Sequence, residues 1–148
     1  MSQLSSLLGN EFNDGNSTVD LATFVGDSPI VGIYFSAHWC GPCRGFTPKL
    51  TDFYKKLSSE GTPMPIVFGS SDRDAESFAS YFAEMPWHAF NFGDERIATL
   101  KSKYQVSGIP WLVVLNTKTG ELVLNEADTM ISEGSVAYAK WCETAAKL

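Results

Sequence analysis

Residues 30–43, Ile30-Val31-Gly32-Ile33-Tyr34-Phe35-Ser36-Ala37-His38-Trp39-Cys40-Gly41-Pro42-Cys43, decide the fold. The first six residues are β-branched, aromatic or glycine and carry no charge, which is typical of a strand that is buried on both faces, as in a parallel sheet. From Cys43 onward apolar residues recur at steps of three and four, which predicts a helix that runs to about Glu60 and ends at Gly61. Two cysteines therefore stand where a buried strand passes into a long helix.

The rest of the chain continues the alternation of strands and helices. We expect a second buried strand, two shorter helices, a β-hairpin and a closing helix, carried in turn by residues 65–69, 74–85, 95–104, 111–124 and 135–148. This order predicts an α/β fold with a central mixed β-sheet that is flanked by helices on both faces. The sheet is expected to be parallel for its first strands and antiparallel at the hairpin.

Length and composition limit the class of protein. A chain of 148 residues with 44% hydrophobic side chains is long enough for a filled core, and we expect one domain over residues 1–148. The net charge of −6 would repel a phosphate backbone, and no basic cluster offsets it, so we expect no nucleic-acid partner. No apolar run approaches the roughly 20 residues that span a bilayer, so we expect no membrane partner either.

Two observations favour a reducing compartment. Residues 1–12 have no basic region and no continuous apolar run, so they do not have the pattern of a secretory signal. Three cysteines are an odd number and too few for a secreted disulfide framework in a chain of this size. We therefore expect a cytoplasmic location, with the nucleus as an open alternative. In such a compartment a close pair of cysteines indicates redox chemistry or a metal site.

The position of Cys40-Gly41-Pro42-Cys43 favours redox chemistry. A thiolate at a helix N-terminus faces unpaired backbone N–H groups and the positive end of the helix dipole, which lower a cysteine pKa from about 8.5. We expect Cys40 to be exposed and nucleophilic, and Cys43, one turn inside the helix, to be shielded and to act second. The two intervening residues let the sulfurs close a disulfide, and Arg44 and His38 could add positive potential.

A structural or metal-binding pair is the alternative reading of these cysteines. Zinc would need two more ligands, and only His38, His88 and Cys142 remain, none of them in a second close pair. We therefore expect no metal. The chain has no flavin or nicotinamide motif, so we expect no cofactor, and the electrons must come from an external reductant, either a protein or a low-molecular-weight thiol.

Several motifs together resemble one family. They are Trp39-Cys40-Gly41-Pro42-Cys43-Arg44 with Pro48 and Gly108-Ile109-Pro110, and, more specifically, residues 34–40, Phe46-Thr47-Pro48 and Met85-Pro86-Trp87. The first set resembles the thioredoxin fold, and the wider set resembles the tryparedoxin and nucleoredoxin branch of that superfamily. The resemblance is close from about residue 30 to residue 116.

The resemblance implies a role for individual residues. Cys40 matches the attacking cysteine, Cys43 the resolving one and Trp39 the aromatic residue beside the site. Gly41 and Pro42 complete the motif on the substrate side. Pro110 matches a cis-proline that faces the disulfide, and the backbone of Ile109 would pair with the substrate chain as an added strand.

Three positions depart from the pattern of the relatives. Gly41-Pro42 is the thioredoxin pairing, where many tryparedoxins and nucleoredoxins have two prolines. Tyr34 stands where thioredoxin carries a buried carboxylate, so a proton at Cys43 must use another group, a water or none. Trp111 follows Pro110 at a position where a small hydroxyl residue is usual. We therefore expect a narrower or more aromatic substrate groove.

Other residues have structural interpretations that compete with functional ones. His38 could tune Cys40 or be a bystander. Asp72, Asp74 and Glu76 fit the start of a helix, although one of them could approach the redox site from the neighbouring strand end. Asp94 and Glu95 fit the start of the following helix in the same way. Cys142 fits a small buried apolar side chain better than a regulatory thiol, and Trp87 fits a core residue.

The function expected from residues and resemblance together is that of a thiol-disulfide oxidoreductase that reduces protein disulfides. Its partners would be protein disulfide substrates and the external reductant. A redox-responsive binding module of the nucleoredoxin type is the alternative, in which the fold holds a partner and oxidation tunes the contact.

Overall fold

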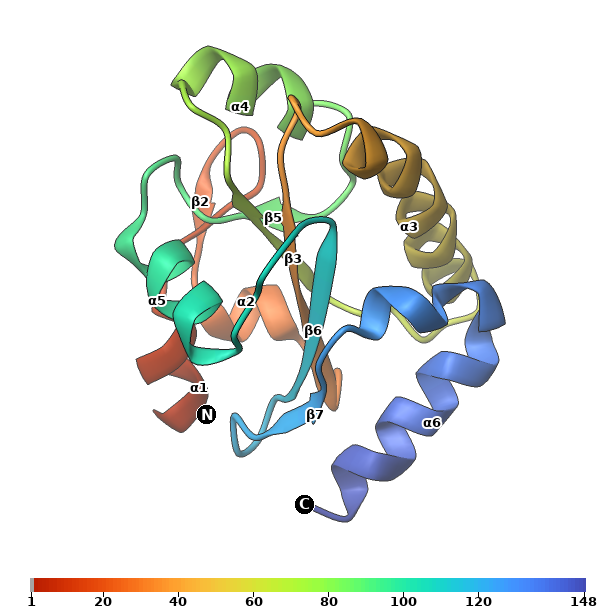
Figure 1. Cartoon of the computed structure of the whole chain (residues 1–148). Helices are drawn as coiled ribbons and strands as arrows, with labels where there is room; N and C mark the ends of the chain where they lie inside the picture. The colour runs from red at the N-terminus through yellow and green to blue at the C-terminus, as the bar shows by residue number, and fades with distance from the viewer. Residues whose placement is uncertain (1) are drawn as a thin grey trace.

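A mixed sheet of seven strands forms the centre of the computed structural model, which describes residues 2–148 (Figure 1). Met1, the first residue of the segment without signal character, lies outside the described residues. The strands are β1 (Phe12–Asn13), β2 (Thr18–Val19), β3 (Ile30–Ser36), β4 (Ile66–Ser70), β5 (His88–Ala89), β6 (Trp111–Asn116) and β7 (Leu122–Leu124). The helices are α1 (Ser2–Leu8), α2 (Leu21–Val25), α3 (Gly41–Ser59), α4 (Ala75–Phe82), α5 (Glu95–Lys103), the 3-10 helix η1 (Ala127–Glu133) and α6 (Ser135–Ala146).

The strand order confirms the predicted mixed sheet. The order is β2-β1-β5-β4-β3-β6-β7, with β3, β4 and β5 parallel to one another. β6 runs antiparallel to β3, with Phe35 opposite Trp111, and β7 runs antiparallel to β6. The carboxyl end of β3 therefore lies beside the amino end of β6, so the segments that follow Ser36 and precede Trp111 meet at one edge of the sheet.

β3 is the central strand, and all seven of its residues are buried. Side chains alternate across a sheet, so residues two apart share a face. Ile30 and Tyr34 contribute to the apolar core on one face, and Val31, Ile33 and Phe35 to the core on the other. Burial on both faces explains why this stretch carries no charge.

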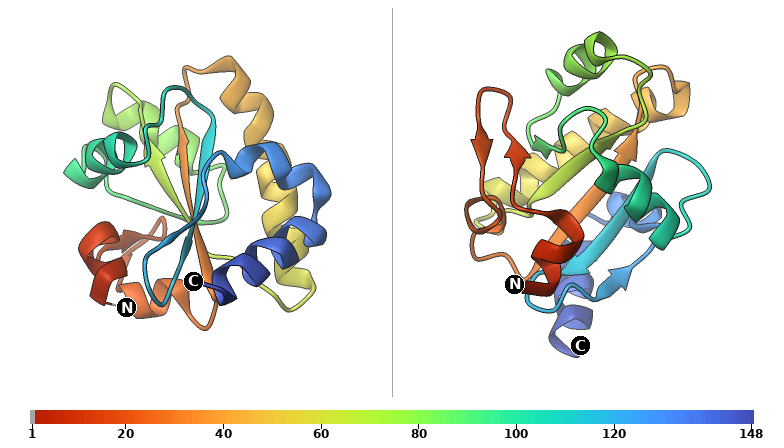
Figure 2. Two further views of the ribbon diagram at one scale, coloured as in Figure 1. Left: turned by 60° about the horizontal axis from the view of Figure 1, so that its bottom comes forward. Right: turned by 90° about the vertical axis from the view of Figure 1, so that its left-hand side faces the viewer.

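Helices cover both faces of the sheet. α3, α4 and α6 contribute side chains to the core that contains Tyr34, whereas α1, α2 and α5 contribute to the core that contains Phe35. The two views of Figure 2 show α3 and α6 on the side of the sheet opposite α1 and α5. Trp87 is buried in the first core, as predicted. Within residues 2–148, none of the helices combines the length and apolar character needed to cross a bilayer.

The structure adds elements that the sequence pattern does not reveal. These elements are too short to show a hydrophobic period, and they are α1, α2, η1 and the two-residue strands β1, β2 and β5. Some predicted bounds also shift. α3 begins at Gly41, α4 ends at Phe82, and Met85 lies beyond α4 but still in the same core. Cys142 was expected to be buried, but it is only half-buried and packs at the margin of that core, because it lies beside Trp141, which takes the inward position on α6.

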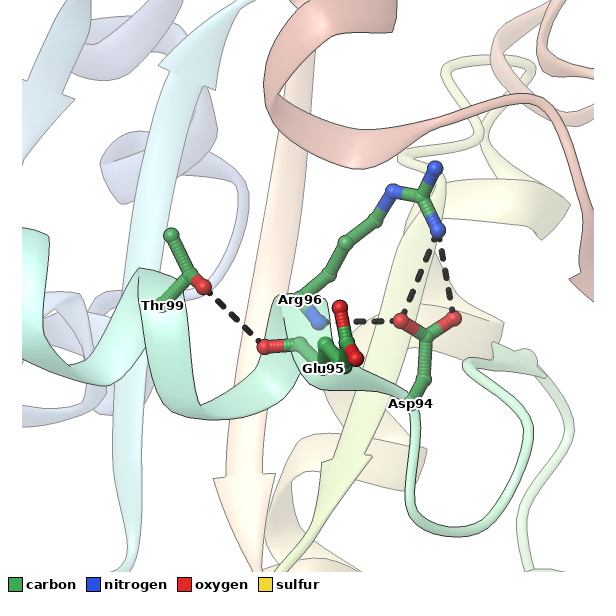
Figure 3. Close-up of polar contacts among 4 residues, drawn as sticks. All are labelled: Asp94, Glu95, Arg96 and Thr99. Carbon is green, nitrogen blue, oxygen red and sulfur yellow. Dashed lines mark hydrogen bonds and ion pairs between the residues drawn. The ribbon is translucent and has the colours of Figure 1, made fainter.

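The start of α5 shows how a local signal sets an element boundary. Asp94 is the N-cap, and its Oδ1 accepts the backbone N–H of Arg96 at 2.9 Å (Figure 3). The Arg96 guanidinium returns to the same carboxylate at 3.4 Å, and the Thr99 hydroxyl donates to the Glu95 carbonyl at 3.1 Å. Both carboxylates at this helix start, Asp94 and Glu95, match the expected helix-start role.

This cap predicts a graded loss of stability. Asp94→Ala removes the acceptor for the first turn and is expected to lower the free energy of unfolding by about 1 kcal/mol. Asp94→Asn keeps an N-cap oxygen and loses only a half-exposed ion pair, so a few tenths of a kcal/mol are expected. Urea denaturation of both variants measures the difference, and an equal loss in the two would contradict capping as the main contribution.

Candidate functional site

The two cysteines of the motif lie in different surroundings at the start of α3. Cys40 is the N-cap of the helix, and its Sγ accepts the backbone N–H of Cys43 at 3.2 Å. Gly41 and Pro42 are exposed in the first turn between them. Cys43 is completely buried, as predicted. The expectation that Cys40 is exposed was wrong, since only 7% of its surface is accessible.

A second loop accounts for the shielding of Cys40. The Ile109–Pro110 peptide bond is cis, as predicted, and it directly precedes β6. The Ile109 carbonyl lies 3.8 Å from Cys40 Sγ, and the Ile109 side chain packs against Ala37 and both cysteines. The antiparallel pairing of β3 with β6 brings this loop to the motif, so a thiol near the surface becomes largely covered.

Burial sets the protonation state of Cys43. Burial raises the pKa of the Cys43 thiol to about 11, and the hydrogen bond with Cys40 acts in the same direction. A hydrogen bond with the Ser36 hydroxyl opposes this rise in part, since it favours the thiolate. Cys43 is therefore a neutral thiol at neutral pH.

Four buried hydroxyl groups from β3, α3 and α4 form a cluster that includes Ser36, the neighbour of Cys43. Tyr34 and Thr47 are hydrogen-bonded at 2.7 Å, Thr47 and Tyr81 at 2.5 Å, and Ser36 and Tyr81 at 2.8 Å. Burial raises the pKa of both tyrosines, which keeps them neutral. The position expected to differ from thioredoxin, Tyr34, therefore contributes an uncharged hydroxyl. Sequence reasoning missed this cluster, since its residues are far apart in the chain.

The loop after β4 fixes the backbone of the motif loop. Asp72 is buried, and its Oδ1 accepts the backbone N–H of His38 at 2.7 Å while its Oδ2 accepts the Ser70 hydroxyl at 2.7 Å. The expectation that one of three carboxylates could approach the site is met by Asp72. Asp74 instead caps α4, and Glu76 lies in its first turn.

Trp39 presents an aromatic surface beside Cys40. Its side chain is 51% exposed, although its indole N–H donates to the Ser71 carbonyl at 3.0 Å. The Arg73 guanidinium lies 5.1 Å from the ring centre, a cation–π arrangement that orients the indole. The polar anchor and the exposed ring give a rigid apolar platform next to a largely covered sulfur.

His38 and Arg44 line a groove of about 440 Å³ beside the motif. The His38 ring stacks on the Tyr81 ring with centroids 5.3 Å apart, and Thr47 and Glu84 also line this groove. Trp111 is half-buried, and its indole N–H donates to Asn125 at 2.7 Å. Over residues 2–148 the His, Cys, Asp and Glu side chains form no group of three or more that could hold a metal ion.

Comparison with known proteins identifies clear relatives. A family model described as Thioredoxin-like matches residues 28–122. Probable nucleoredoxin 1 of Arabidopsis thaliana is 49% identical over 107 residues, which are 72% of this chain and 18% of the relative. Nucleoredoxin of Mus musculus is 46% identical over 106 residues, which are 66% of this chain and 24% of the relative. The chain thus spans about a fifth of the length of these nucleoredoxins.

Tryparedoxins match over most of their own length. Tryparedoxin of Trypanosoma brucei brucei is 38% identical over 117 residues, which are 78% of each chain. The solved structure of tryparedoxin II from C. fasciculata superposes with a TM-score of 0.81 at 34% identity, covering 92% of this chain and 90% of that one. A solved structure described as tryparedoxin II complexed with glutathionylspermidine superposes with a TM-score of 0.81 at 33% identity, covering 91% of this chain and 94% of that one.

The burial of Cys43 predicts a pH-dependent reactivity. In a Cys40→Ser/Cys142→Ser variant, Cys43 is the remaining thiol, and its alkylation by iodoacetamide should be slow at pH 7. Burial, the main cause of the raised pKa of Cys43, persists in this variant, so the thiolate fraction, and with it the rate, should rise about tenfold per pH unit from neutral into alkaline pH. A matched Cys43→Ser/Cys142→Ser variant follows Cys40. Equal rates of the two thiols at pH 7 would contradict the shielding of Cys43.

The Asp72 anchor predicts a specific loss of stability. Asp72→Ala leaves the His38 N–H and the Ser70 hydroxyl without their acceptor, which is expected to lower the free energy of unfolding by about 1–3 kcal/mol. Asp27→Ala, which removes an exposed carboxylate far from the motif, serves as the control and should change stability little. Equal midpoints of the two variants in urea denaturation would show that Asp72 does not hold the loop.

Proposed function

The chain belongs to the thioredoxin-like family, in its tryparedoxin and nucleoredoxin branch, and we propose that this thiol oxidoreductase reduces protein disulfides with Cys40 as nucleophile and Cys43 as resolving thiol. The observation that carries the proposal is the unequal setting of the two sulfurs. Cys40 receives an N–H at the start of a helix, and Cys43 lies buried one turn inside. A backbone donor aimed at a sulfur stabilises negative charge there.

In the first step the Cys40 thiolate attacks a substrate disulfide. A bond forms between Cys40 Sγ and one substrate sulfur, and the substrate disulfide breaks. The second substrate sulfur leaves with the electron pair and takes a proton from solvent. The product is a mixed disulfide at the N-terminus of α3.

In the second step Cys43 loses its proton and attacks Cys40 Sγ. The Cys40–Cys43 disulfide forms, the mixed disulfide breaks, and the substrate leaves as a thiol after it takes up a proton. The protein has then given two electrons to the substrate. An external reductant must return two electrons and two protons to open the new disulfide.

The surface around Cys40 supports an extended peptide as the substrate. The backbone at Ile109 lies next to the sulfur, where it could pair with a substrate strand by β-addition. Trp39, which precedes Cys40 in the chain, adds an exposed aromatic surface. Gly41 and Pro42, which follow Cys40 in the chain, are exposed and can contact a substrate bound over the largely covered sulfur.

The external reductant is proposed as a chemical class of electron donor. A solved relative, tryparedoxin II, is described in complex with glutathionylspermidine, which supports a low-molecular-weight thiol as one donor class for this chain, with a protein dithiol as the other. Such donors operate in a reducing compartment, so a cytoplasmic or nuclear location is part of the proposal.

A redox-responsive binding module is the second candidate. The exposed Trp39 beside a sulfur that is only 7% accessible favours it, because such a surface could hold a partner without turnover. Similarity to nucleoredoxins, of which the chain spans about a fifth, is consistent with either role.

Turnover of a protein disulfide separates the two candidates. With a small dithiol as electron donor, the wild-type protein should reduce the substrate, and Cys40→Ser should lose this activity to the uncatalysed rate, because no other thiol replaces the nucleophile. Cys43→Ser should accumulate a mixed disulfide, which mass spectrometry detects. Full activity in Cys40→Ser would contradict the proposed reductase function. Partner capture that survives the loss of both Cys40 and Cys43 would establish the binding module instead.

A further inference from the structure

The resolving step raises the question of where the Cys43 proton goes. Cys43 has no accessible surface, so bulk water does not reach its thiol. Hydrogen bonds with the Ser36 hydroxyl and with the backbone of Ala37 lower the pKa of this thiol against the effect of burial, so both groups lie next to it. In the mixed disulfide Cys40 is already bonded through its sulfur and can no longer accept a proton. The Ser36 hydroxyl is then the side chain left to receive it.

Ser36 continues into a line of hydrogen-bonded hydroxyls. Its Oγ is 2.8 Å from the Tyr81 hydroxyl, which is 2.5 Å from Thr47 Oγ1. Either atom of each pair can be the donor, so the line can be polarised in both directions. The three residues come from β3, α4 and α3 and are all buried, which protects the line from competing water.

The far end of this line reaches the surface. Thr47 and Tyr81 both line the groove of about 440 Å³ beside the motif, together with His38 and Glu84. Tyr34 also bonds to Thr47, but it has no accessible surface and therefore forms a side branch. The hydroxyl line thus connects a sealed thiol at one end with solvent at the other.

We propose that Ser36, Tyr81 and Thr47 form a proton path that serves Cys43 in the resolving step. This inference rests on the proposed function and adds a route that it leaves open. The Cys43 thiol gives its proton to Ser36, Ser36 passes its own proton to Tyr81, Tyr81 to Thr47, and Thr47 to water in the groove. Each hydroxyl ends neutral, and the electron pair left on Cys43 forms the bond to Cys40.

The chemistry of the path suits a relay rather than a base. Burial raises the pKa of Tyr81, so its hydroxyl stays protonated at neutral pH and can only exchange one proton for another. The His38 ring stacks on the Tyr81 ring where both line the groove. Ser36, Tyr81 and Thr47 are therefore positioning and relay groups that act through Cys43.

A two-phase reaction tests the path separately from the proposed function. When reduced protein meets the symmetrical disulfide of thionitrobenzoate, Cys40 releases the first thionitrobenzoate, and the attack of Cys43 on the mixed disulfide releases the second. All proteins carry Cys142→Ser so that two thiols remain. Stopped-flow absorbance then gives one rate for each step, in H₂O and in D₂O.

Tyr81→Phe breaks the path and keeps the ring. The second phase is expected to slow about tenfold or more at pH 7, within the range that general acid–base groups contribute, while the first phase keeps its rate. The solvent isotope effect of the second phase should also change, because the proton then no longer passes through the Tyr81 hydroxyl. Tyr104→Phe is the matched control, since the buried Tyr104 hydroxyl has no hydrogen-bond partner among residues 2–148.

The outcomes separate the two ideas. A second phase in Tyr81→Phe with the wild-type rate and isotope effect overturns the path. Absence of the first phase in the parent protein, which carries Cys142→Ser alone, overturns the proposed function instead. If Tyr81→Phe does not fold, Thr47→Val and Thr47→Ser decide, because Val removes the hydroxyl and Ser retains it. A slow second phase in Val with recovery in Ser supports the path, and equal rates in both overturn it.

Discussion

The antiparallel pairing of β3 with β6 is the constraint on which the site depends. It places Phe35 opposite Trp111, so the motif that follows β3 and the cis Ile109–Pro110 bond that precedes β6 emerge at the same edge. Because both strands are buried and bonded along their length, the sheet, rather than either loop, determines how near the Ile109 carbonyl lies to Cys40. Displacement of one strand against the other would separate the two parts of the site.

The same geometry gives two sulfurs, three residues apart, opposite chemical characters. Cys40 sits at the helix start with a backbone donor and a narrow opening to solvent, while Cys43 is enclosed by the sheet and remains a thiol. The hydroxyl next to the enclosed sulfur, that of Ser36, belongs to a cluster of neutral hydroxyls rather than to a carboxylate. A buried negative charge near Cys43 would disfavour its thiolate, so an uncharged surrounding removes that opposition.

Much of the fold and part of the site could be predicted from local sequence patterns. Three predictions that depend only on neighbouring residues agree with the structure. They are the buried strand β3, the helix α3 and the position of the cysteine pair between them. Asp94 was predicted as a cap for the same reason. Asp72 resembled a cap by the same rule, but its partner is His38, 34 residues away, and no local pattern encodes that contact. The shielding of Cys40 by Ile109, 69 residues on, and the hydroxyl cluster were likewise invisible, because they depend on how strands and helices meet.

The alternation of β3 has a consequence for how this chain can vary. Tyr34 and Ser36 lie two residues apart and reach the hydroxyl cluster on the α3 side, while Phe35 between them belongs to the opposite core. Insertion or deletion of one residue within this strand would exchange the two faces. The Phe35 ring would then point to the α3 side, and the Tyr34 and Ser36 hydroxyls would point into the opposite apolar core. We therefore expect this strand to tolerate a change in length of two residues but not of one. The number of residues between the start of the strand and the first cysteine is constrained in the same way.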